Sequence, residues 1–120
     1  MRKVVTMVAL ALALSAPLAR AADAPTAALT VVNIEYEGTK IWVPSNLIVK
    51  KGSKVTLTLI NNVPPDGSQH GFAIPDYKIE ELVTKGEPKT VEFVANKAGI
   101  FPIHCQLHPK HVAGSLVVLP

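Results

Sequence analysis

The sequence predicts an all-β fold, a Greek-key β-sandwich or barrel with at most one short helical turn. Short apolar segments, several of them rich in β-branched residues, follow one another along the chain, and turn residues separate them. No segment carries ten residues of helical periodicity with caps. With 120 residues, the chain is long enough for one such domain but too short for a second core.

The first half of the domain contains four predicted strands. Residues 29–36 alternate apolar and polar side chains, and two short strands flank a turn at Ser45 and Asn46. Alternate apolar residues share one face of residues 54–60, with threonines on the other face. A loop follows at residues 61–69, because this segment contains Pro-Pro and Asp-Gly.

The second half completes the predicted sheet. Strands are expected at residues 70–74, 90–94, 100–105 and 115–119, each next to turn or loop residues. Residues 79–83 are expected to form the single helical turn.

The N-terminus has the pattern of a secretory signal peptide. A basic start precedes an apolar run of about half the ~20 residues that a membrane span needs, and small residues then fit a cleavage site. We therefore expect a signal peptide at residues 1–21, export to the periplasm and no stable membrane anchor. A short flexible leader is expected at residues 22–28, and the folded domain at residues 29–120.

The predicted cleavage changes the net charge of the chain and the set of side chains left to bind a metal. The formal net charge of the whole chain is +3, but residues 1–21 hold three of its twelve basic residues and none of its nine acidic ones. The remainder is neutral, so nucleic-acid binding, which needs a basic face, loses its compositional support. Both methionines, Met1 and Met7, also lie in the predicted signal peptide.

Cys105 is the only cysteine of the chain. An unpaired thiol in an oxidising compartment is oxidised or cross-linked unless something protects it. It could be a buried inert thiol, part of an intermolecular disulfide or a metal ligand. Three of the four histidines lie within six residues of it: His104, His108 and His111. The fourth, His70, begins a predicted strand after a loop.

The pattern around Cys105 favours the metal. Strand alternation turns Cys105 inward and His104 outward, so we interpret His104 as a structural or surface residue. A tight loop around an ion can bring His108 and His111 to the thiol, whereas a continued strand or helix cannot. One thiolate with imidazoles suits copper or zinc, and the single cysteine favours copper because structural zinc sites usually take two or more.

At these residues the sequence resembles the cupredoxin (blue-copper) family, over nearly the whole domain. The similarity lies in VPSNLIVKKGSK at residues 43–54, in KAGIFPIHC at residues 97–105 and in GSLVV at residues 114–118. The resemblance implies that a histidine after the middle loop, a cysteine at a strand end and a histidine three residues later bind one copper ion. These positions are held here by His70, Cys105 and His108.

The ligand loop departs from the family in its axial position. Its spacing is similar to that of the short-loop amicyanin type, but His111 stands where that type has the axial methionine. A nitrogen ligand favours Cu(II) over Cu(I), so we expect a green or red site of low potential. The string CQLHPK also resembles part of nitrosocyanin, the red-copper member, which has a glutamate where His70 stands and a longer loop. Gly71 leaves only backbone to support the Cys105 sulfur, where many relatives carry a hydrogen-bonding side chain.

Three functions remain open on these residues: one-electron transfer, copper handling or resistance, and a catalytic nitrosocyanin-like centre. A single soft sulfur speaks against a Cu(I) carrier, and no general acid/base pair accompanies the site. We therefore expect a monomeric electron-transfer protein without enzymatic activity, with one copper ion cycling between Cu(I) and Cu(II). The resemblance implies that a redox partner protein docks around the loop histidine, near His108, Leu107, Pro109 and Val112.

Overall fold

The computed structural model describes residues 22–120, and the predicted signal peptide lies outside this range. The described residues form nine strands and one short 3-10 turn. The elements are Thr26–Tyr36 (β1), Thr39–Val43 (β2), Asn46–Lys50 (β3), Lys54–Asn61 (β4), Gln69–Ile74 (β5), Pro75–Tyr77 (η1), Ile79–Thr84 (β6), Lys89–Val94 (β7), Gly99–Ile103 (β8) and Gly114–Leu119 (β9).

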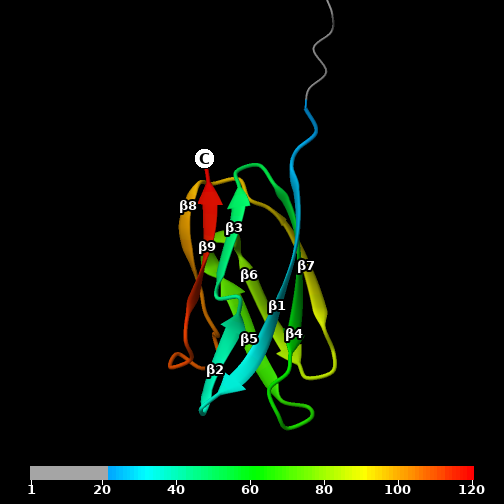
Figure 1. Cartoon of the computed structure of the whole chain (residues 1–120), viewed down its shortest axis with the longest axis vertical. Helices are drawn as coiled ribbons and strands as arrows, with labels where there is room; N and C mark the ends of the chain where they lie inside the picture. Colours follow the sequence, from blue (N-terminus) through cyan, green and yellow to red (C-terminus); the bar gives the residue numbers. More distant parts are fainter. Residues whose placement is uncertain (1–21) are drawn as a thin grey trace, which may run out of the picture.

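The strands form two layers (Figure 1). One layer is a sheet of order β2-β1-β4-β7, and the other contains a sheet of order β3-β9-β8. The pair β5-β6 extends this second layer, because a bridge between Ala73 and His104 joins β5 to the end of β8. Neighbours such as β1 and β4, or β3 and β9, are not consecutive in the chain, so connections cross between the layers. The predicted all-β sandwich is confirmed.

The core lies between the layers and follows the alternation of the strands. In β4 every second residue is buried, and Leu57 and Leu59 are fully enclosed. Phe72 and Ile74 of β5 and Leu116 of β9 meet them from the other layer. Burying each such side chain stabilises the fold by about 1.5–3 kcal/mol, so this core provides the rigid frame for the loops at its ends.

Two sequence predictions are corrected. The first strand begins at Thr26, inside the segment expected to be a flexible leader, because residues 26–28 pair in parallel with residues 54–56 of β4. Residues 79–83 are not a helical turn. They belong to β6, where Ile79 and Val83 are buried and the strand pairs antiparallel with β5.

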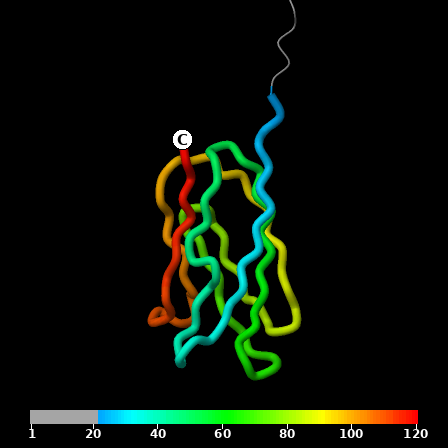
Figure 2. The backbone as a smooth tube through the Cα atoms, in the orientation of Figure 1, coloured from blue at the N-terminus to red at the C-terminus, as the bar shows by residue number. Residues whose placement is uncertain are grey.

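Several connections lie at one end of the sandwich. They include the β1–β2 hairpin, the β4–β5 loop, the β6–β7 turn and the long β8–β9 loop (Figure 2). A bridge between Ile41 of β2 and Val112 ties the hairpin to the β8–β9 loop. Among residues 22–120 there is no helix with the length and apolar content that a membrane crossing needs.

Candidate metal centre

His70 is positioned by the loop that precedes it and by β5. It is the second residue of β5 and is 6% exposed. Asn61, at the end of β4, organises the approach: its side-chain Nδ2 donates to the carbonyls of Ser68 (2.9 Å) and Val83 (3.0 Å). Its Oδ1 accepts from the backbone N–H of Val63 at 2.9 Å. These bonds hold both ends of the loop and the neighbouring strand β6 in register with His70.

Cys105 follows the end of β8 and points inward, as the strand alternation predicts. It is 4% exposed. The chain then makes two successive turns, in which the N–H of His108 donates to the Cys105 carbonyl (3.2 Å) and the N–H of His111 donates to the His108 carbonyl (3.0 Å). The two histidine rings consequently stack on the same side of the loop, with centroids 4.4 Å apart.

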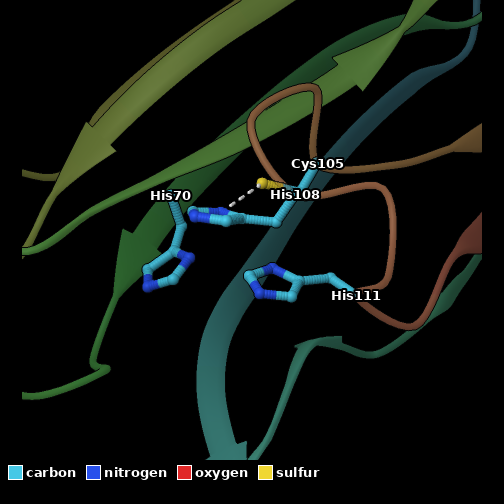
Figure 3. A group of neighbouring side chains, drawn as sticks. All are labelled: His70, Cys105, His108 and His111. Atoms are coloured by element: carbon cyan, nitrogen blue, oxygen red, sulfur yellow. Dashed lines mark hydrogen bonds between the residues drawn. The ribbon is translucent and has the colours of Figure 1, made fainter.

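The structure brings together all four predicted ligands. One donor atom from each of His70, Cys105, His108 and His111 lies within 4.8 Å of the others. Figure 3 shows the three rings and the sulfur gathered in one space between β5 and the β8–β9 loop. His104, the remaining histidine, is outside this group. Its backbone is bridged to β5, which fits the interpretation of His104 as a structural or surface residue.

The donor set fits a single copper ion. Two donors on opposite sides of one first-row ion, each at roughly 2.0–2.3 Å, lie about 4.0–4.6 Å apart, which is close to the span of this group. The Nδ1 atoms of His70 and His111 are buried and have no hydrogen-bond partner within residues 22–120. Because buried polar atoms are normally satisfied, these two nitrogens indicate an additional binding partner. A thiolate with imidazoles is the donor chemistry that copper accepts.

Burial favours the neutral form of the His70 and His111 imidazoles. It lowers the pKa of His70, and repulsion from the protonated forms of His111 and His108 lowers that pKa further. Burial likewise lowers the pKa of His111, followed by the effect of His108. The neutral imidazole is the form that coordinates a metal.

The sulfur of Cys105 receives a hydrogen bond from backbone, as the presence of Gly71 predicts. The N–H of Gly71 donates to Sγ at 3.2 Å. The indole Nε1 of Trp42 donates to the carbonyl of the same residue at 2.9 Å. Trp42 is buried, at 5% exposure. Its hydrogen bond to Gly71 could not be predicted from the sequence, because no local pattern links β2 to β5.

Exposed apolar side chains flank His108 at the surface. His108 is exposed, and so are Leu107 (45%) and Val112 (50%). Leu107, His108, Pro109, Lys110 and His111 line an open hollow. The Lys40–Glu35 ion pair, 3.0 Å between charged atoms, lies on the neighbouring β1–β2 hairpin.

A two-layer β-sandwich with a thiol and three imidazoles at one end defines the class of mononuclear copper domains. The family described as the cupredoxin-like domain matches residues 4–118. The chain therefore belongs to the cupredoxin family.

Several known proteins are similar to this chain, either in part of the sequence or in the fold. The nitrous-oxide reductase of Cupriavidus necator is 44% identical over 57 residues, which are 48% of this chain and 9% of that enzyme. The copper nitrite reductase of Nitrosomonas europaea has a TM-score of 0.59 at 22% identity, over 79% of this chain and 42% of that one. Auracyanin from Roseiflexus castenholzii has a TM-score of 0.62 at 16% identity, over 78% of this chain and 97% of that one. At these low identities, the two solved structures show a common fold.

Proposed function

We propose that this protein is an exported cupredoxin that transfers single electrons. In this proposal the copper ligands are His70, Cys105 and His108, with His111 as a fourth. The observation that carries the proposal is the convergence of these donors, together with two buried imidazole nitrogens that have no hydrogen-bond partner among the described residues. When bound, copper would supply a one-electron Cu(I)/Cu(II) couple.

The residues of the site have distinct tasks. His70, buried on a paired strand, and Cys105, buried after β8, provide rigid donors whose positions need little adjustment. The β8–β9 loop supplies His108 and His111 through two hydrogen-bonded turns. A preformed donor set of this kind limits rearrangement between the two oxidation states, which favours fast electron transfer.

His108 is the expected electron port. It is the exposed member of the group, and Leu107, Pro109 and Val112 surround it with exposed apolar surface. A redox partner docking on this surface would bury a small area, as weak electron-transfer encounters do. Transient contact suits a protein that must release its partner after each electron.

Electron transfer is favoured over the other functions of copper domains by the donor set itself. A single thiolate with three imidazoles is a poor match for a Cu(I) carrier, which would use several soft sulfurs. Two of the proteins similar to this chain are named as reductases. The matched parts are only 9% and 42% of those two enzymes, so their similarity does not by itself support an enzymatic role.

Optical and EPR spectra of the copper-loaded protein test the proposal. We expect a thiolate-to-copper charge-transfer band that disappears on reduction and returns on oxidation. In His111→Ala the loss of a nitrogen donor should shift the band and raise the reduction potential, because nitrogen stabilises Cu(II). His104→Ala is the matched control and should leave both unchanged, since His104 lies outside the group.

Three outcomes would contradict the proposal. A loaded protein without the charge-transfer band would exclude Cys105 as a ligand. Ready loss of copper to a mild chelator would point to copper handling instead. A spectrum changed by added azide would indicate an exchangeable coordination position and a catalytic centre.

A further inference from the structure

Gly71 lies where the pairing between β5 and β8 stops. Ala73 and His104 exchange two backbone hydrogen bonds, of 2.8 Å and 3.0 Å. In an antiparallel ladder the next such pair would be Gly71 and Gln106, two residues further along each strand. Instead, the N–H of Gly71 donates to the Cys105 sulfur, and its carbonyl accepts from Trp42. The side chains of Cys105 and Trp42 therefore take the place of the backbone hydrogen bonds that Gly71 and Gln106 would otherwise form.

The side chain of Gln106 occupies the space above Gly71. A Cβ atom added to Gly71 would lie 2.2 Å from Oε1 and 2.6 Å from Cδ of Gln106. The same carboxamide donates from Nε2 to the Glu81 carbonyl of β6 at 3.1 Å. Its Oε1 is buried and accepts no hydrogen bond from the described residues. This amide thus packs against the backbone of β5 instead of extending into solvent.

From this packing we propose that Gln106 is a positioning residue for the metal site. Anchored to β6 through Glu81, its carboxamide covers Gly71 and holds the Gly71 N–H on the sulfur of Cys105. The residue acts through Gly71 and is not itself a ligand. A side chain at position 71 would displace this cover, because its Cβ would meet the end of the Gln106 side chain.

The hydrogen bond to the sulfur affects the reduction potential of the site. A donor to a thiolate withdraws electron density that the sulfur would otherwise give to the metal, and this tunes the reduction potential in copper–thiolate proteins. Displacing Gln106 should loosen the Gly71 N–H and let the sulfur donate more strongly. The expected direction is a lower reduction potential and a shifted charge-transfer band.

Gln106→Ala tests this inference, with Gln69→Ala as the matched control. Gln69 lies on β5, next to His70, and its side chain bonds to Thr84 at an exposed position. In the copper-free protein, amide hydrogen exchange at Gly71 should become roughly tenfold faster in Gln106→Ala than in the wild type. In the loaded protein the band and the potential should shift, whereas Gln69→Ala should change neither property.

A double variant separates positioning from general damage. Gly71→Ala should produce the same spectral shift, and adding Gln106→Ala to it should produce little more, since both changes remove one contact. Additive shifts, or an unchanged potential and unchanged Gly71 exchange in a folded Gln106→Ala protein, would overturn the inference. If Gly71→Ala does not fold, the comparison of Gln106→Ala with Gln69→Ala decides.

This inference rests on the proposed function only for the measurements made with copper. If the wild-type protein showed no charge-transfer band, the proposed function would fail. The exchange rate of the Gly71 amide in the copper-free protein would still decide whether Gln106 holds that bond.

Discussion

Asn61 shows how one buried side chain positions a ligand that it does not touch. Its amide bonds to three backbone groups, on the β4–β5 loop and on β6, and the loop leads directly to His70. In Asn61→Ala these groups lose their partners in a buried place, which costs about 2–4 kcal/mol in free energy of unfolding. Urea denaturation of the copper-free protein measures this loss.

Asn62→Ala is the control for that prediction. Asn62 is the exposed neighbour, and its side chain forms none of the hydrogen bonds of the described residues. A change within about 0.5 kcal/mol is expected there. Equal losses in the two variants would mean that the bonds of Asn61 are not what stabilises the loop.

At Gly114 the backbone of Ser45 comes so close that a side chain would not fit. A Cβ atom there would lie 2.0 Å from the Ser45 carbonyl oxygen, which accepts a hydrogen bond from the N–H of Ser115. Backbone cannot move aside as a flexible side chain can, so Gly114→Ala should destabilise the fold by about 1–3 kcal/mol. Thermal denaturation checks this. Ser115→Ala, which removes only an exposed bond to Asn46, should be nearly neutral.

At this scale the sequence indicated which four side chains come together better than it indicated the contacts that support them. The histidine-rich loop around a lone cysteine and the resemblance to cupredoxins led to the four proposed donors, and Gly71 after His70 led to the expected backbone bond to the sulfur. The contacts of Trp42 and Gln106 could not be predicted, because they join segments that no periodicity or spacing relates. Side-chain packing across strands is decided by the assembled fold.

Among the elements, the bounds of β4, β5, β7 and β9 agree with the prediction to within one residue. In β4 the alternation is strong, and the observed bounds differ from the prediction by one residue. The predicted turn at residues 79–83 was wrong because two apolar residues four positions apart share one face of a strand as well as of a helix. Pairing with β5 selects the strand. Likewise, the start of β1 depends on β4 beside it, which local sequence does not reveal.

The β8–β9 loop carries a prediction about docking. Replacing Leu107 and Val112 together by serine removes exposed apolar side chains next to His108. We expect electron self-exchange to slow about tenfold, which corresponds to ~1.4 kcal/mol lost in the encounter. The optical spectrum and potential should stay the same because neither residue belongs to the donor group. NMR line broadening in mixtures of the two oxidation states measures the rate.

Leu119→Ser provides the control for surface hydrophobicity. Leu119 is 43% exposed but ends β9, away from the ligand loop at its start. Its substitution should leave self-exchange unchanged. A similar slowing in both proteins would show that the apolar surface next to His108 has no special role.

Considered as a whole, the molecule joins distant parts of its chain at the donor group. His70 belongs to β5 and Cys105 follows the end of β8, so β6, β7 and β8 lie between them in sequence. A metal that binds only the folded form, at 100 times its Kd, adds about 2.7 kcal/mol of stability. At roughly 4 °C or more per kcal/mol for a domain of this size, copper should raise Tm by about 10 °C.

Differential scanning calorimetry with and without copper measures this effect. Cys105→Ala should abolish most of the increase, because it removes the thiolate. Removing copper from the wild-type protein with a strong chelator should restore the lower Tm. An increase that persists in Cys105→Ala would place the stabilising ion elsewhere on the protein.

The direction of the outer strands has a practical consequence. β9 starts beside the ligand loop and runs to the opposite end of the sandwich, and β1 enters the fold at that same far end, where Thr26 pairs with the start of β4 (Figure 1). Six residues of β9 extend about 20 Å. A tag or linker attached behind Leu119 would thus hold the protein on an electrode or a resin with the loop histidine facing outward into solution.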